Sequence, residues 1–205
     1  MSKDYQIAAN EVEHETVVKR SRFICYLFPC TSIEQAKAQV KLIQKLHPQA
    51  RHHCYAFLTK AANNSLGYGY SDDGEPSGTA GKPMLAVLQG SGIGEVCAVV
   101  VRYFGGIKLG TGGIQRAYAD SVRQAHLFLQ AKTKIAMAAK TLACQYSQVD
   151  DVLHIIRQVE GKVVEQEYLQ QVQFSLLVPE AKVAVVKRQL KSLSAGKLVL
   201  ANFKE

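Results

Sequence analysis

The sequence that decides the fold is Val96-Cys-Ala-Val-Val-Val-Arg-Tyr-Phe-Gly-Gly-Ile-Lys-Leu-Gly-Thr-Gly-Gly113. Its first six residues are apolar without polar alternation, which predicts a strand at 96–101 that is buried on both faces at the centre of a sheet. The glycines that follow let the chain reverse and then begin a helix at about 113–131. Thirteen of the fifteen glycines in the chain lie between Gly67 and Gly113. Because ordering glycine costs conformational entropy, this clustering predicts a site where something approaches the main chain closely.

A second glycine-rich segment reads Ser71-Asp-Asp-Gly-Glu-Pro-Ser-Gly-Thr-Ala-Gly-Lys-Pro83. It holds three carboxylates, Asp72, Asp73 and Glu75, whose oxygens can bind a divalent cation or take part in catalysis. Asp-Gly and Glu-Pro are also ordinary turn sequences, in which Asp side chains accept local backbone N–H bonds. We favour the structural turn, because turn preference alone accounts for these residue types.

The segment around Arg102 predicts an anion-binding site. The buried strand ends at Arg102, and the glycine-rich turn after it leads into a helix that carries Arg116 in its first turn. Free N–H groups and the positive dipole end at a helix start attract anions, and both guanidinium groups would strengthen this attraction. Arg102 has an alternative role, because it can pair with a carboxylate of the 71–83 segment and join the two loops. The predicted anion-binding or nucleic-acid-binding residues are Arg102, Gly105, Gly106, Lys108, Gly110, Gly112, Gly113 and Arg116.

Two familiar nucleotide-binding motifs do not match this region. Gly78-Thr-Ala-Gly-Lys82 is too short for a Walker A loop, and Pro83 stands where that motif has Ser or Thr. The glycine spacing also departs from the Gly-x-Gly-x-x-Gly fingerprint of dinucleotide-binding domains. The anion site is therefore predicted from local chemistry and not from a known phosphate loop.

The motif Arg51-His-His-Cys54 contains residue types that bind metals. Neighbouring strand residues point to opposite faces, so His52 and His53 do not readily share one ion. The chain also lacks Cys-x-x-Cys and His-x-x-x-His spacings. We therefore expect no metal and no cofactor, and instead a polar strand end with one histidine facing a ligand. The residues expected to line the site are His52, His53, Asp72, Asp73, Glu75 and Lys82.

The sequence predicts two domains that meet near residue 135. The first contains an extended start at 15–27, then an amphipathic helix that ends at Leu46 and has Thr31 or Ser32 as its N-cap. A strand at 54–59 and a helix near 83–89 complete its pattern. After residue 134 the predicted strands and helices alternate regularly, at 141–146, 149–160, 161–169, 171–178, 179–194 and 197–203.

This second series has the order βαββαβ, the split βαβ pattern of ferredoxin-like domains. We therefore predict an α+β chain with an α/β domain at 1–135, which holds the glycine-rich loops, and a ferredoxin-like domain at 136–205. No linker rich in Pro or Ser marks the boundary.

Composition restricts the partners and the compartment. The chain has 205 residues, a formal net charge of +8 and a pI near 9.2, which favours anionic partners such as nucleic acids. It has no run of about 18 apolar residues and no secretory signal at its start, so we expect no membrane partner. Its odd number of scattered cysteines predicts reduced, buried thiols in a cytoplasmic protein; they are Cys25, Cys30, Cys54, Cys97 and Cys144.

Three motifs, Arg51-His-His-Cys54, residues 71–83 and residues 99–113, resemble nearly end to end the bacterial YigZ branch of the IMPACT family. The resemblance covers the whole chain. It implies an N-terminal domain with the fold of the second domain of a small-subunit ribosomal protein, which several nucleotide-using enzymes share. It also implies a ferredoxin-like C-terminal domain similar to domain V of elongation factor G. Eukaryotic relatives of the N-terminal domain act in the control of translation initiation, and the resemblance implies no set of catalytic residues.

Two function classes follow from the sequence. The first is a translation-associated regulatory protein that binds RNA or a ribosome-associated partner through its basic, glycine-rich surface. The second is an enzyme that acts on a small phosphorylated or nucleotide substrate at the same loops, with Asp72, Asp73 or Glu75 as metal-binding or acid–base groups. We favour binding over catalysis, because no nucleophile and base can be paired from their spacing. The C-terminal strands also lack the aromatic spacing of an RNA-recognition sheet, so contacts to RNA would be mainly electrostatic.

Overall fold

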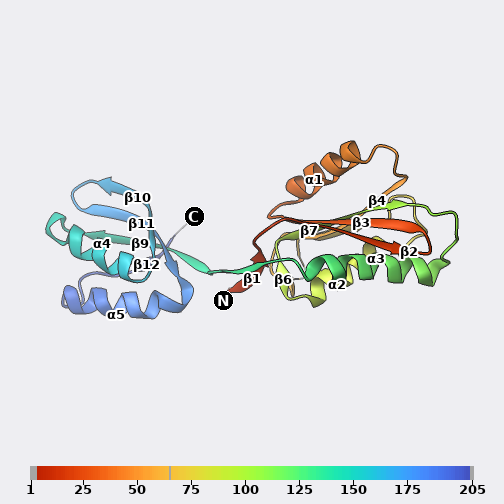
Figure 1. Ribbon diagram of the computed structural model, residues 1–205. Helices are drawn as coiled ribbons and strands as arrows, with labels where there is room; N and C mark the ends of the chain where they lie inside the picture. Colours follow the sequence, from red (N-terminus) through yellow and green to blue (C-terminus); the bar gives the residue numbers. More distant parts are fainter. Residues whose placement is uncertain (1–3, 65, 204–205) are drawn as a thin grey trace. The chain divides into compact units, whose positions relative to one another are not determined.

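The computed structural model describes residues 4–64 and 66–203. It divides into two compact units, one comprising Tyr5–Lys134 and the other comprising the chain from Ile135 together with Asp4 (Figure 1). Both units combine helices with β-sheet, so the predicted α+β chain with two domains is confirmed.

The N-terminal unit is built on a five-stranded antiparallel sheet in the order β2-β3-β7-β4-β5. Strand β7 lies in the middle of this sheet, and its residues 96–101 are fully buried, as their unbroken apolar sequence predicts. The extended segment expected at 15–27 is a hairpin, which turns at Lys19 and Arg20 with positive φ angles. The five strands are β2 (Val12–Val18), β3 (Ser21–Pro29), β4 (His52–Leu58), β5 (Tyr68–Ser71) and β7 (Val96–Tyr103).

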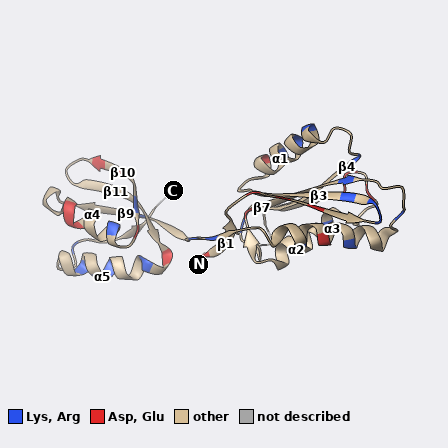
Figure 2. Cartoon of the chain, viewed as in Figure 1, with Lys and Arg blue, Asp and Glu red and all other residues tan. Residues whose placement is uncertain are grey.

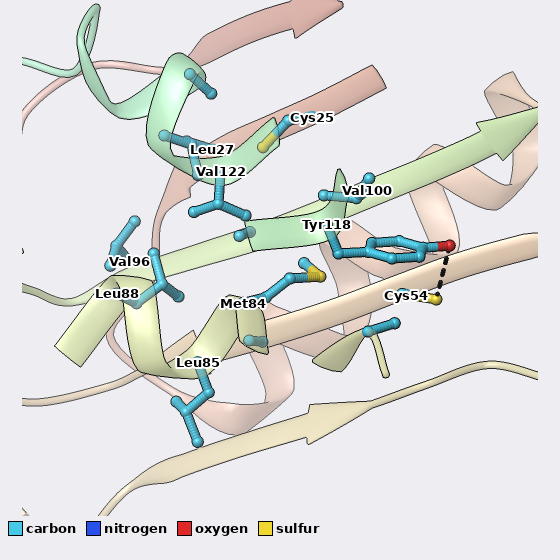
Figure 3. Close-up of a cluster of buried hydrophobic side chains, with 14 of the residues drawn as sticks. Cys25, Leu27, Cys54, Met84, Leu85, Leu88, Val96, Val100, Tyr118 and Val122 are labelled. Atoms are coloured by element: carbon cyan, nitrogen blue, oxygen red, sulfur yellow. Dashed lines mark hydrogen bonds between the residues drawn. The ribbon is translucent and has the colours of Figure 1, made fainter. Parts of the chain in front are cut away.

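Helices cover both faces of this sheet. Helix α1 (Ile33–Leu46) lies on one face, and α2 (Gly81–Gly90) and α3 (Thr111–His126) lie side by side on the other (Figure 1). The side chain of Ser32 accepts a bond from the Gln35 backbone N–H, so Ser32 is the N-cap of α1. Between the sheet and the α2–α3 pair lies a core that includes Tyr118, Met84, Leu88, Val96 and Val100 (Figure 3).

A second, three-stranded sheet joins segments that are distant in the sequence, and the sequence did not predict it. Strand β1 (Tyr5–Ala8) pairs in parallel with β6 (Ile93–Gly94) and antiparallel with β8 (Ala131–Lys134). Strand β8 begins at Ala131, the last residue of the helix expected at 113–131. The observed helix α3 begins two residues earlier than expected and ends at His126.

The C-terminal unit has the predicted βαββαβ order, and its antiparallel sheet has the strand order β10-β11-β9-β12. This arrangement is ferredoxin-like. The elements are β9 (Met137–Cys144), a 3₁₀ turn at Tyr146–Gln148, α4 (Val149–Gln158), β10 (Lys162–Tyr168), β11 (Val172–Pro179), a 3₁₀ turn at Glu180–Lys182, α5 (Val183–Leu193) and β12 (Ala201–Asn202).

The last strand is shorter than the one expected at 197–203. The backbone of Leu198 donates to the Ser194 hydroxyl oxygen, and the side chains of Leu198 and Leu200 are buried in the core. This segment is therefore held by its side chains and by a helix-end hydrogen bond, and only residues 201–202 join the sheet.

Candidate functional site

A groove of about 850 Å³ lies at the start of helix α3, and five of the predicted site residues line it: His52, Glu75, Arg102, Lys108 and Gly110. Four segments form it: the chain that enters β4, the turn before α2, the end of β7, and the start of α3. Its lining residues are Gln49, Ala50, Arg51, His52, Glu75, Pro76, Arg102, Tyr103, Phe104, Lys108, Leu109, Gly110, Thr111 and Ile114. The fold thus brings together residues from both glycine-rich segments and from the Arg51-His-His-Cys54 motif.

Helix α3 presents free backbone donors to this groove. Its N-cap is Gly110, which has a φ of +71° and offers no capping side chain, and the first turn contains no acidic residue. Within the described part of the chain, the N–H groups of residues 111–113 have no hydrogen-bond acceptor. The helix dipole adds positive potential at this end of the groove, and Lys108 and Arg51 on its lining add charge of the same sign.

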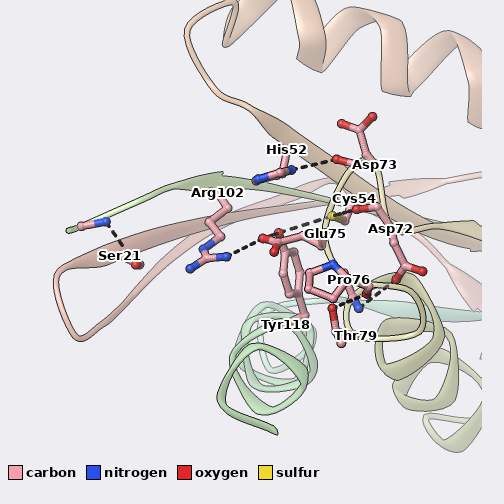
Figure 4. A network of polar contacts seen from close by, with 12 residues as sticks. Ser21, His52, Cys54, Asp72, Asp73, Glu75, Pro76, Thr79, Arg102 and Tyr118 are labelled. Carbon is pink, nitrogen blue, oxygen red and sulfur yellow. Dashed lines mark hydrogen bonds and ion pairs between the residues drawn. The ribbon is translucent and has the colours of Figure 1, made fainter. Parts of the chain in front are cut away.

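The wall of the groove is a buried ion pair (Figure 4). Arg102 Nη1 donates to Glu75 Oε1 over 2.6 Å, and Tyr118 Oη donates to the same oxygen over 2.9 Å. Both ionic side chains are buried, so Arg102 joins β7 to the turn before α2, which is the alternative role that its sequence position allowed. The Nε atom of Arg102 is also buried and has no hydrogen-bond partner among the described residues.

Cys54 continues this polar network into the core. Its Sγ lies 3.3 Å from Tyr118 Oη and 2.9 Å from the carbonyl oxygen of Asp72. Burial raises the pKa of the Cys54 thiol and the pKa of the Tyr118 hydroxyl. Both groups therefore stay protonated at neutral pH, and Cys54 is no thiolate nucleophile.

Asp72 and Asp73 are turn residues, as favoured from the sequence. The carboxylate of Asp72 accepts hydrogen bonds of 2.8–2.9 Å from the backbone N–H groups of Gly78, Ala80 and Gly81, at the start of α2. Burial alone would raise the pKa of Asp72, but these three donors outweigh it and lower the pKa. Asp73 accepts from the His53 backbone N–H over 2.6 Å. Both carboxylates are therefore occupied by the protein's own backbone.

The two histidines point to different surroundings, as the strand alternation predicts. His52 lines the groove, and its ring Nδ1 donates to the carbonyl oxygen of Asp73 over 2.8 Å. His53 is buried, and its ring Nε2 donates to the carbonyl oxygen of His47 over 3.1 Å. No group of three or more His, Cys, Asp or Glu side chains in residues 4–64 and 66–203 has the geometry to hold a metal ion.

The expected convergence of Arg102 and Arg116 on one anion is wrong. Because α3 begins at Thr111, Arg116 is the sixth residue of the helix and lies in its second turn. It is exposed and lines a separate groove between α2 and α3, whereas Tyr118, two positions later, faces Glu75. Residues two apart in a helix differ in direction by about 200°. Lys82 is exposed on the first turn of α2 and lines neither groove.

The glycines of the loop have different roles. A Cβ on Gly105 would lie 2.0 Å from the carbonyl carbon of Arg20, so Gly105 is required by the close approach of the β2–β3 turn and not by a ligand. Gly110 needs its positive φ to begin α3. Gly106 and Gly112 have no heavy atom within 4 Å of an added Cβ, so the space beside them is open.

Nine of the residues that line the groove were not predicted as site residues, and three of these nine are charged or aromatic. Phe104 follows the buried strand and is 59% exposed, Tyr103 precedes it, and Arg51 begins the histidine motif. The guanidinium carbon of Arg102 lies 5.8 Å from the centroid of the Phe104 ring. The sequence signal for Phe104 was its place directly before Gly105-Gly106, because loops lie on the surface and often carry binding residues.

Comparisons with known proteins agree with this architecture. The Impact N-terminal domain model matches residues 19–126, which include every residue that lines the groove. The chain belongs to the IMPACT family. A second model, Domain of unknown function (DUF1949), matches residues 142–197 in the ferredoxin-like unit. The resemblance seen in the three motifs is thus confirmed over both units.

Among IMPACT relatives, the IMPACT family member YigZ of Escherichia coli is 45% identical over 188 residues, which cover 92% of each chain. An IMPACT family member of Haemophilus influenzae is 40% identical over 197 residues, or 96% of each chain. The crystal structure of a hypothetical protein matches all of this chain and all of its own, with a TM-score of 0.79 and 42% identity. No helix in the described part of the chain is long and apolar enough to cross a membrane.

Proposed function

We propose that this IMPACT-family protein is a translation-associated regulator that binds RNA in the groove at the start of α3. One observation carries the proposal. The free N–H groups of the first turn of α3, the cations Arg51 and Lys108, and the exposed ring of Phe104 line the same groove. Helix N-termini and basic side chains bind phosphates, and exposed aromatic rings stack on bases.

The charge of the N-terminal unit supports an anionic polymer as the ligand. Residues 1–135 contain 16 Lys and Arg residues against 10 Asp and Glu residues, so most of the net charge of +8 lies in this part of the chain. Figure 2 shows the basic residues of this unit spread over several of its elements. A distributed positive field attracts a long polyanion and makes its affinity depend on salt.

The chemistry of the groove favours binding over catalysis. The carboxylates of Asp72 and Asp73 are occupied by backbone N–H groups, and Glu75 is held by Arg102 and Tyr118. Cys54 is buried and protonated. These groups hold one another in place, which suits a rigid binding surface. The assignment to translation rests on the family resemblance, which implies two domain folds that the translation machinery uses.

The test is a fluorescence anisotropy titration with a single-stranded RNA of about 12 nucleotides, a length within the range that one small domain covers. We expect affinity to fall log-linearly with salt between about 50 and 200 mM. Phe104→Ala should weaken binding by about 1–3 kcal/mol through lost stacking. Lys108→Ala should reduce the salt slope by about one.

Matched controls distinguish RNA binding at this groove from non-specific effects of charge and hydrophobicity. Phe128 is 58% exposed in the same unit but lies outside the groove, so Phe128→Ala should leave the affinity unchanged. Lys41 is exposed on α1, and Lys41→Ala should keep the salt slope of the parent. Absence of RNA affinity at low salt, or equal losses in the Phe104 and Phe128 variants, would refute RNA binding at this groove.

A further inference from the structure

A second groove of about 720 Å³ runs between α2 and α3, and RNA binding at the start of α3 leaves it unused. Its residues recur at helical spacing on both helices, which places them in two facing stripes. The lining residues are Pro83, Ala86, Val87, Gly90 and Ser91 from α2 and its C-cap, and Gln115, Arg116, Ala119, Arg123, His126 and Leu127 from α3 and its C-cap.

Three of the residues that line this groove are small. They are Ala86 and Gly90 on α2 and Ala119 on α3, and none of the three has a side chain larger than a methyl group. Small side chains allow a third helix to approach to the 8–10 Å between axes that is usual for packed helices. The ten residues of α2 extend over about 15 Å, which is enough for about three turns of such a helix. At one end Leu127 is 72% exposed and offers an apolar anchor.

The charged residues that line this groove are basic. Arg116 and Arg123 are seven residues apart, which is two turns, so both lie on one side of α3 at about 10 Å spacing. None of the lining residues is acidic. Arg123 pairs with Asp120, but both side chains are more than half exposed, and such surface pairs exchange readily for another carboxylate. The Nε2 atom of His126 is buried and has no hydrogen-bond partner among the described residues.

We propose that this groove is the docking site for an amphipathic α-helix of a partner protein, which presents small apolar residues to Ala86 and Ala119 and carboxylates to Arg116 and Arg123. A helix fits a groove that is lined by residues at helical spacing on two neighbouring helices and that contains small side chains. Other complexes in which an amphipathic helix lies in a groove have the same arrangement. The small apolar side chains disfavour RNA, whose backbone needs polar contacts. Helix α3 would then serve two ligands, with RNA at its N-terminus and the partner helix along its side.

The test uses a synthetic helical peptide of about five turns, with alanine and leucine on one stripe and glutamate flanking it at seven-residue intervals. A second peptide carries lysine at the same positions. The full chain, labelled with ¹⁵N, is titrated with each peptide and followed by NMR. The glutamate peptide should bind at least tenfold more tightly than the lysine peptide, and the amide shifts should map to α2 and α3.

Three variants make the assignment specific. Ala86→Glu places a carboxylate in the groove. Ala86 is exposed on a helix, so this substitution should leave the melting temperature unchanged. The variant should no longer bind the glutamate peptide. The double variant Arg116→Glu and Arg123→Glu should reverse the preference and bind the lysine peptide. The matched control Lys41→Glu on α1 should bind as the parent does.

Equal binding of both peptides, or no binding to either at millimolar concentration, would overturn the proposal. Self-association of the chain that Ala86→Glu abolishes would assign the groove to a second copy instead. Shifts of Ala86 and Ala119 amides on addition of RNA, with displacement of the peptide, would assign it to nucleic acid. Loss of RNA binding alone would leave this proposal intact, because Phe104 and Lys108 lie in the other groove.

Discussion

Arg102 Nη1 lies 2.6 Å from Glu75 Oε1, and this buried contact joins the central strand β7 to the turn before α2. The two residues are 27 positions apart in the sequence and belong to different glycine-rich segments. The pair therefore holds together two walls of the groove in which we propose that RNA binds.

Arg102→Met should destabilise the protein by about 3–5 kcal/mol, because it leaves the buried carboxylate of Glu75 without its cation. The free energy of unfolding from urea titration measures this loss. Replacing both partners, as Arg102→Met with Glu75→Gln, should cost less than the single arginine change, because no uncompensated buried charge remains. A double variant less stable than Arg102→Met would show that the two residues do not act as a pair.

Asp72→Ala should lower the free energy of unfolding at pH 7 by about 1–2 kcal/mol, the usual loss when a helix start loses its capping carboxylate. The lowered pKa of Asp72 sets the pH dependence. A carboxyl group whose pKa is lower in the folded state than in the unfolded state stabilises the fold. Its full contribution is present above the unfolded pKa of about 4 and is lost as the pH falls through the folded pKa.

The difference in free energy of unfolding between the parent and Asp72→Ala should therefore be constant from about pH 5 to 7 and should shrink below about pH 4. Urea titrations across this range measure it. Asp120→Ala is the control, since Asp120 is exposed and pairs only with Arg123 among the described residues, and it should change stability by less than about 0.5 kcal/mol. A difference that grows on acidification would contradict the capping role.

Gly105→Ala and Gly112→Ala should have opposite effects. The added methyl group at Gly105 would overlap the backbone of Arg20, so we expect a loss of about 3 kcal/mol. At Gly112, in the first turn of helix α3, the added methyl group meets open space, so we expect a gain of up to about 0.5 kcal/mol. Thermal melts of the two variants beside the parent test the pair. If Gly105→Ala is neutral, the β2–β3 turn does not pack on the loop as described.

All five thiols should react slowly with a disulfide reagent in the folded protein. Cys25, Cys30, Cys54 and Cys97 are fully buried, and Cys144 is 2% exposed. Burial raises the pKa of Cys25, Cys54 and Cys144, which reduces their thiolate fraction further. We expect no fast phase at pH 8 and five equivalents after denaturation. A fast stoichiometric phase that a single Cys→Ser variant removes would identify an accessible thiol and contradict this burial.

The sequence predicted the elements whose signals are local. Residues 96–101 are all apolar, and such a run is stable as a strand only when it is buried on both faces, so the central position of β7 followed directly. Ser32 begins α1 because its hydroxyl accepts a neighbouring N–H, which is a contact within four residues. The βαββαβ order of the C-terminal unit was also predicted, because its signals are local.

Elements without a local signal were missed. Strands β1, β6 and β8 are two to four residues long and carry no clear alternation, so only their pairing across the chain makes them strands. Arg116 was expected in the first turn of its helix, but α3 begins at Thr111, which places Arg116 in the second turn. Its direction is set by packing between elements, because Tyr118 faces Glu75 and residues two apart in a helix differ in direction by about 200°.

The sequence by itself determined the two-domain α+β class, the central strand and the location of the candidate site, because hydrophobic runs, caps and glycine turns are local properties of the chain. Only the tertiary structure decided how the charged residues of that site are paired. Glu75, Arg102 and Tyr118 meet through three separate elements, and Arg116 turns away into a second groove. Charge pairing depends on distances of a few ångströms between elements. Packing sets those distances, and no periodic pattern in the sequence predicts them.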